Sequence, residues 1–319
     1  MPEFYIHHRT LYGYPTKVID SANQIKLYPI TDSHQQVVDH RLAISHQPSV
    51  YTVQDYFGNT TGFFSILLPH QELSIESFLR VNITKPLFAP QVAASDAWYQ
   101  FLEEENQLKH YDFLKAEVAR CEAEVLAIIS QEINKQLHPL DALNQLSAYV
   151  YKNFTYKKGV TDIETQVDEI WKLKAGVCQD FAHLLLYMMR LMGIPGRYIS
   201  GYICPGNSEW RGEGATHAWA EAWMHDLGWV GIDPTNNCLA GERHVRLATG
   251  RNFTDVTPVK GTYKGGEEHV LEVTVQFSTT EFNDQQLYGA APNYLSAVQP
   301  DPLARNSYVA YMQMQQQQQ

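Results

Sequence analysis

The stretch Ala175-Gly-Val-Cys-Gln-Asp-Phe-Ala-His183, continued by Leu184-Leu-Leu-Tyr-Met-Met-Arg-Leu-Met192, decides the fold of this chain. The apolar, methionine-rich second part predicts a helix that stops at the following Gly193 and Pro195. Gly176 allows a tight turn into this helix, so Cys178 should lie at or near its first turn. Unpaired backbone N–H groups and the helix dipole favour a thiolate there, and they also favour a developing oxyanion. Cys178 is therefore a candidate nucleophile.

Two later segments, Thr216-His-Ala-Trp-Ala-Glu-Ala-Trp223 and Gly228-Trp-Val-Gly-Ile-Asp-Pro234, predict a β-hairpin. If the hairpin is centred on His225, His217 pairs directly with Asp233, and the two Cβ atoms are roughly 5 Å apart. Asp233 then accepts a hydrogen bond from one imidazole nitrogen and leaves the other for a thiol. The chain order predicts a triad in which Cys178 is the nucleophile, His217 the base and Asp233 the acid that orients the histidine.

Pattern and composition predict an α+β chain of two domains and a tail. Short alternating segments with β-branched and aromatic residues indicate a β-sandwich-like N-terminal domain over residues 1–86. Helix and strand signals then alternate, which predicts a catalytic domain over residues 87–283. Residues 284–319 are polar and end in five consecutive glutamines, so we interpret them as a tail. Within the second domain, helical periodicity predicts long helices over residues 95–108 and 112–135.

Charge and cysteine usage exclude several classes of function. The formal net charge of −11 argues against a nucleic-acid partner, because phosphate contacts need clustered Lys and Arg. No apolar run is long enough for a membrane span, and the N-terminus has no signal pattern, so we expect a cytoplasmic protein without a membrane partner. The four cysteines include no Cys-x-x-Cys pair and no His-Glu-x-x-His occurs, so we expect neither a metal nor another cofactor.

Each chemical residue also has an ordinary structural interpretation. A buried cysteine is more often an inert core residue than a nucleophile, and a histidine on a strand is usually structural. Trp219, Trp223 and Trp229 are interpreted as core residues of the hairpin rather than as the lining of a cleft. The three candidate triad residues occur in the order cysteine, histidine, aspartate, which a Cys-His-Asp enzyme needs, and this combination favours catalysis.

At these residues the sequence resembles the transglutaminase-like superfamily, and within it a bacterial cysteine-protease-like branch with a β-rich N-terminal region. The resemblance extends over Gly193-Ile-Pro-Gly-Arg-Tyr-Ile-Ser-Gly-Tyr202, His217-Ala-Trp-Ala-Glu221 and Asp233-Pro-Thr-Asn236. It implies a papain-like core in which the nucleophile helix packs on an antiparallel sheet that carries the histidine and the aspartate. Cys178, His217 and Asp233 match the nucleophile, base and orienting acid of the family.

One feature of the family has no match here. Transglutaminases proper use an upstream tryptophan to assist the oxyanion, whereas only Trp98 and Trp171 precede Cys178, and neither has a suitable spacing. The second oxyanion donor is therefore open, and the case for protein cross-linking is weakened.

The resemblance and the triad together imply acyl transfer through a thioester, on a peptide, protein or amide substrate. Water as the acceptor gives a cysteine protease or amidase, which ranks first; an amine as the acceptor gives a transglutaminase. A catalytically silent peptide-binding scaffold is the alternative from another class. The sequence predicts neither the substrate nor the oligomeric state.

Overall fold

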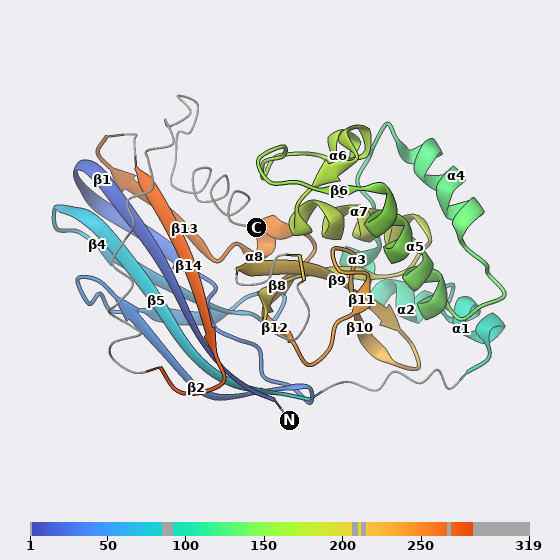
Figure 1. The fold of residues 1–319 in the computed structure, drawn as a ribbon, viewed down its shortest axis with the longest axis horizontal. Coiled ribbons are helices and arrows are strands. Elements are labelled where there is room, and N and C mark those ends of the chain that lie inside the picture. The colour runs from blue at the N-terminus through green and yellow to red at the C-terminus, as the bar shows by residue number, and fades with distance from the viewer. Residues whose placement is uncertain (1, 85–91, 206–209, 212–214, 267–268, 283–319) are drawn as a thin grey trace. The chain divides into compact units, whose positions relative to one another are not determined.

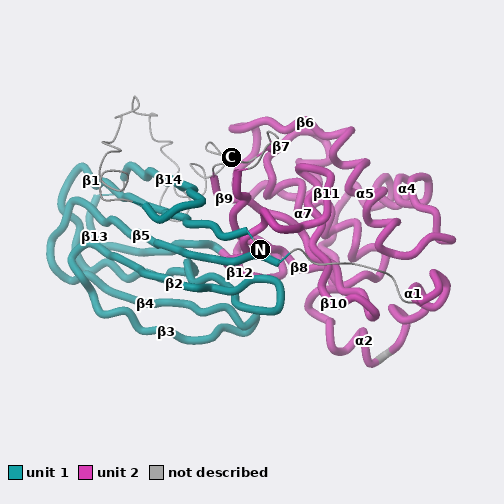
Figure 2. Tube along the Cα trace, turned by 60° about the horizontal axis from the view of Figure 1, so that its bottom comes forward, with its two compact units in different colours: residues 1–84, 257–318 teal, residues 85–256, 319 magenta. Residues whose placement is uncertain are grey.

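The chain forms two compact units, which the computed structural model describes over residues 2–84, 92–205, 210–211, 215–266 and 269–282. One unit combines residues 1–84 with residues 257–318, and the other comprises residues 85–256 and residue 319 (Figure 2). The predicted tail, residues 284–319, lies outside the described residues.

The first unit is all β among its described residues. Its antiparallel strands have the order β2-β5-β1-β4-β3, and β13 and β14 also pair with β1. Figure 1 draws the early strands of this unit in blue to cyan and β13 and β14 in orange. The strands are β1 (Glu3–Ile25), β2 (Gln35–Ile44), β3 (Tyr51–Gln54), β4 (Thr60–Ile66), β5 (His70–Ile83), β13 (Val259–Lys264) and β14 (Val270–Ser278). The first half of β1 pairs with β5 and β14, and its second half pairs with β4 and β13. One long strand thus joins the two halves of this β-rich unit.

The boundaries of the units correct the predicted domains. The N-terminal boundary at residue 86 is close to the observed one at residue 84. The predicted catalytic domain, 87–283, is too long at its C-terminal end, because the chain returns to the first unit at Thr257. The reason is non-local: Thr10 of β1 lies opposite Val273 of β14, a pairing between residues far apart in sequence that short-range alternation does not reveal.

The second unit contains an antiparallel sheet of five strands in the order β11-β10-β9-β8-β12. Its strands are β8 (Gly196–Ile203), β9 (Thr216–Met224), β10 (Gly228–Asp233), β11 (Cys238–Leu239) and β12 (His244–Gly250). The helix α7 (Cys178–Leu191) packs against β8 and β9, and α5 (Pro139–Asn153) and α6 (Val167–Leu173) pack against α7. The predicted α+β core, with the helix that begins at Cys178 packed on an antiparallel sheet, is confirmed.

The long helices predicted from periodicity are broken. The observed short helices are α1 (Ala94–Gln100), α2 (Glu104–Lys109), α3 (Tyr111–Leu114), α4 (Glu122–Glu132) and α8 (Phe253–Val256). The start of α4 is fixed from outside the helix, because the Asp168 carboxylate of α6 accepts hydrogen bonds from the backbone N–H groups of Arg120 and Cys121, at 3.0 and 2.8 Å. A contact with a distant part of the chain therefore starts a new helix at a position where the apolar periodicity of the sequence predicts the middle of a longer one.

Two short strands complete the second unit. β6 (Thr155–Tyr156) and β7 (Ala175–Gly176) pair in parallel, immediately before α7 begins. Within the part of the chain that the structure describes, no helix is long and apolar enough to cross a membrane.

Candidate active site

Cys178 is the first residue of α7, as the sequence predicts, with Val177 as the N-cap. Asp180 fixes this start: its Oδ2 accepts hydrogen bonds from the Val177 N–H at 2.7 Å and from the Thr161 hydroxyl at 2.6 Å. Gly176 is required here, because a Cβ at this position would lie 2.5 Å from Asp180 Oδ2. The backbone N–H of Cys178 belongs to the first turn of α7, where the N–H groups point out of the N-terminal end of the helix.

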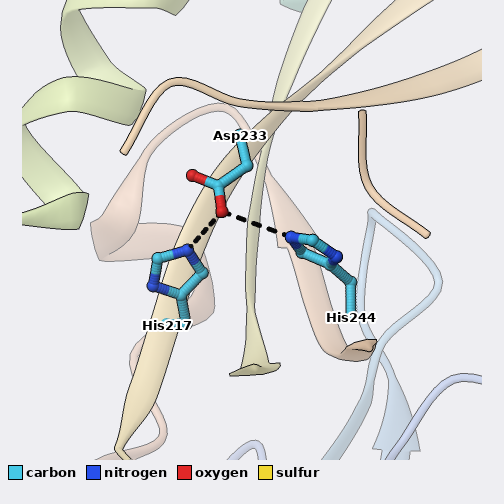
Figure 3. A group of neighbouring side chains, drawn as sticks. All are labelled: His217, Asp233 and His244. Atoms are coloured by element: carbon cyan, nitrogen blue, oxygen red, sulfur yellow. Dashed lines mark hydrogen bonds and ion pairs between the residues drawn. The ribbon is translucent and has the colours of Figure 1, made fainter. Parts of the chain in front are cut away.

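His217 and Asp233 lie together on the neighbouring strands β9 and β10. His217 Nε2 is 2.8 Å from Asp233 Oδ2, and both side chains are fully buried (Figure 3). The predicted register is wrong by two residues: a hairpin centred on His225 would place Trp219 opposite Gly231, whereas Glu221 lies there. A shift of two residues keeps every side chain on the same face of the sheet, so the contact survives the error.

The carboxylate of Asp233 is held by a dense set of donors. Its Oδ1 accepts hydrogen bonds from the backbone N–H groups of Thr235 and Asn236, at 2.9 and 3.2 Å. Its Oδ2 accepts from the side-chain amide of Asn236 at 2.8 Å, in addition to His217. Because the turn after β10 supplies three of these donors, the carboxylate is oriented before any substrate binds.

His244, at the start of β12, is a second imidazole on the same carboxylate (Figure 3). Its Nε2 is 3.3 Å from Asp233 Oδ2, and its Nδ1 accepts a hydrogen bond from the Gly241 N–H at 3.1 Å. Since Nδ1 is an acceptor, the ring is neutral and carries its proton on Nε2. Burial lowers the pKa of His244, which agrees with a neutral ring. Sequence reasoning missed this residue because β12 pairs with β8, on the far side of β9 from β10.

The charges at the site make His217 a cation. Burial by itself lowers the pKa of His217, but the electrostatic and hydrogen-bond interactions with Asp233 and Cys178 outweigh burial and raise the pKa to about 10. Burial raises the pKa of Asp233, but His217 and His244 outweigh that effect and lower it below its ordinary value. Because His217 Nε2 is used by Asp233, Nδ1 is the nitrogen left for the thiol. The arrangement can hold a protonated histidine between a carboxylate and a thiolate.

The same cluster has the composition of a metal site. His217, Asp233 and His244 each offer one ligand atom, and these atoms lie within 4.8 Å of one another. The hydrogen bonds among them account for this approach without an ion. The expectation that the protein uses no metal stays a prediction.

Trp219, Cys121 and Cys238 have the surroundings of structural residues. Trp219 is fully buried, and a Cβ at Gly201 or Gly231 would meet its ring at 2.7 or 3.3 Å, so its interpretation as core is confirmed. Burial raises the pKa of Cys121 to about 12, and the Asp168 carboxylate adds to this effect. Burial also raises the pKa of Cys238 to about 12. Neither thiol has the setting of a nucleophile.

Comparison with known proteins shows the family of this chain. Residues 127–234 match the model of the transglutaminase-like superfamily, and residues 4–82 match the bacterial transglutaminase-like N-terminal region. The uncharacterized protein Rv2569c of Mycobacterium tuberculosis is 32% identical over 286 residues, which cover 85% of this chain and 90% of the relative. An 87-residue stretch is 31% identical to a protein-glutamine gamma-glutamyltransferase of Pseudomonas aeruginosa, covering 26% of this chain and 13% of that protein.

A solved structure shows the same fold. The crystal structure of a candidate cysteine protease from Cytophaga hutchinsonii superposes with a TM-score of 0.67 at 18% identity, covering 88% of this chain and 92% of the other. A helix that opens on a cysteine, packed on a sheet that carries a histidine–aspartate pair, defines a papain-like architecture. The chain belongs to the transglutaminase-like superfamily, and it carries the bacterial N-terminal region of that group.

Proposed function

We propose that the protein is a thiol-dependent acyl transferase that hydrolyses amide bonds in peptides or proteins. The observation that carries the proposal is the buried pair of His217 and Asp233, 2.8 Å apart, beside a cysteine at the first position of a helix. A cationic histidine favours the thiolate form of Cys178, and the helix N-terminus favours it further. In this reading Cys178 is the nucleophile, His217 the proton carrier and Asp233 the residue that orients His217.

The steps follow from these roles. The Cys178 thiolate attacks the amide carbonyl, and its Sγ forms a bond to carbon while one electron pair moves to oxygen. When the C–N bond breaks, the protonated His217 gives its proton to the leaving nitrogen, and a thioester remains on Cys178. Neutral His217 then takes a proton from water, whose oxygen forms a bond to the thioester carbonyl carbon. When the C–S bond breaks, its electron pair returns to Sγ, the acid leaves, and the Cys178 thiolate and protonated His217 are restored. Deep burial of the site supports the charge pair by excluding bulk water.

Isotope labelling tests this proposal and separates it from transamidation. The protein is incubated with a peptide mixture in ¹⁸O-water with cadaverine present, and the products are read by mass spectrometry. We expect new carboxyl groups that carry ¹⁸O; cadaverine amides at glutamine would instead indicate a transglutaminase. Cys178→Ala should abolish the products, whereas Cys238→Ala, which removes a thiol whose pKa is raised by burial, should keep them.

Two outcomes would contradict the proposal. Products that persist in Cys178→Ala would show that another group acts on the peptide. An absence of both products and a thioester on Cys178 would favour the peptide-binding scaffold. A cytoplasmic location and the absence of nucleic-acid and membrane partners stay predictions.

A further inference from the structure

The hydroxyl of Tyr156 is buried beside the candidate site without a hydrogen-bond partner among the described residues. The ring itself is only partly buried, so the polar end of the side chain points inward. Leaving a buried hydroxyl unpaired costs on the order of 1–3 kcal/mol. Such a group in a native protein calls for an explanation, and one explanation is a partner that appears only during a reaction.

The backbone holds Tyr156 against the start of the nucleophile helix. In the parallel pair of β6 and β7, Tyr156 lies opposite Gly176, two residues before Cys178. The pairing is closed on both sides by hydrogen bonds at 2.8 Å, from the Thr155 N–H to the Lys174 carbonyl and from the Lys157 N–H to the Gly176 carbonyl. Tyr156 is therefore fixed with respect to the first turn of α7.

Ring packing and charge place the hydroxyl toward the reacting groups. The Tyr156 ring meets the ring of Phe181 edge to face, with centroids 6.2 Å apart, and Phe181 lies on the first turn of α7. Burial, followed by the negative charges of Cys178 and Asp233, raises the pKa of Tyr156 above its ordinary value. The hydroxyl thus keeps its proton in the presence of a thiolate and is available as a donor.

We propose that Tyr156 is a catalytic residue, whose hydroxyl donates a hydrogen bond to the oxyanion that forms when Cys178 attacks a carbonyl. This inference rests on the proposed function and supplies the second donor beside the Cys178 N–H. As the S–C bond forms, the carbonyl π electrons move to oxygen, and this oxyanion accepts from both donors. Tyr156 transfers no proton, and the electron pair returns to the carbonyl when the C–N bond breaks.

A comparison of two reactions of one thiol tests the proposal. Acylation of Cys178 by p-nitrophenyl acetate passes through an oxyanion, whereas alkylation by iodoacetamide displaces iodide directly and forms none. For Tyr156→Phe we expect acylation to slow by roughly 100-fold and alkylation to stay within about twofold of wild type. Both rates are measured for Cys178 itself by peptide mass spectrometry.

Tyr187→Phe is the matched control. Tyr187 lies on α7, and its buried hydroxyl also has no partner among the described residues. Burial raises the pKa of Tyr187 to about 12, and the charges that add to this effect belong to Cys121 and acidic residues rather than to Cys178. We expect Tyr187→Phe to leave acylation and alkylation unchanged.

The outcomes separate this inference from the proposed function. If wild type is acylated at Cys178 and Tyr156→Phe reacts equally fast, the role of Tyr156 is wrong and the proposed function stands. If Tyr156→Phe slows both reactions to the same extent, Tyr156 sets the state of the thiol rather than the oxyanion, and the proposal is also overturned. If wild type is not acylated at Cys178 but is alkylated there, the proposed function fails and this inference fails with it.

Discussion

Replacing Asp233 with asparagine tests the charge pair on which the proposed mechanism depends. Asp233→Asn keeps the size of the side chain but removes the negative charge 2.8 Å from His217 Nε2. The pKa of His217 is about 10 against an ordinary value of 6.5, a difference of about 3.5 units. That difference corresponds to about 5 kcal/mol, and it is the net result of burial, which lowers the pKa, and of the interactions with Asp233 and Cys178, which raise it.

We expect the pKa of His217 to fall by roughly 1–3 units in Asp233→Asn, since a single nearby opposite charge has an effect of that size. The assay is an NMR titration of protein with ¹³C-labelled histidine, in which the His217 signal is identified by its loss in His217→Gln. Glu221→Gln is the matched control. Glu221 is a buried acid on β9, the strand that carries His217, but its ion pair is with Arg197 rather than with the histidine.

The same pair predicts a pH dependence of stability. Because the pKa of folded His217 is raised, its protonation stabilises the fold fully below pH 6.5, and this contribution is lost as the pH rises through about 10. The free energy of unfolding, measured with urea, should therefore fall more for wild type than for Asp233→Asn as the pH rises from 6.5 to about 10. A wild-type His217 that titrates near 6.5, or an unchanged pKa in Asp233→Asn, would refute the reasoning.

Three further predictions concern the surroundings of the nucleophile. At pH 7, iodoacetamide should label Cys178 before Cys238, whose pKa burial raises to about 12; equal labelling rates in peptide mass spectrometry would contradict this. Gly176→Ala should lower the free energy of unfolding by about 1–3 kcal/mol, because its Cβ would lie 2.5 Å from Asp180 Oδ2. Gly13→Ala, whose Cβ meets nothing within 4 Å, should change the urea midpoint less, and equal losses would overturn the steric argument. Burial raises the pKa of Asp180 from 3.8 to about 6, so its contribution to stability declines as the pH rises through this range. The stability of Asp180→Asn relative to wild type should then rise by about 1–3 kcal/mol between pH 4 and pH 8, and a relative stability that is the same at both pH values would refute the charge argument.

The sequence by itself determined the features that depend on neighbours along the chain. Gly176 and the apolar run after Cys178 place the cysteine at a helix start, because helix entry and amphipathic periodicity are local properties. The alternation around His217 and Asp233 places both side chains on one face of a hairpin. That inference tolerated a register error of two residues, since side chains in a strand repeat every second position.

Only the tertiary structure decided what depends on segments far apart in sequence. His244 reaches Asp233 across the sheet, and Tyr156 reaches the start of α7 through a parallel pairing with Gly176, which lies 20 residues later in the sequence. The return of β13 and β14 to β1 likewise has no local signal in the sequence. Such contacts depend on which side chains are buried and which backbone groups pair over the whole domain. Neither can be deduced from a pattern of neighbouring residues along the chain.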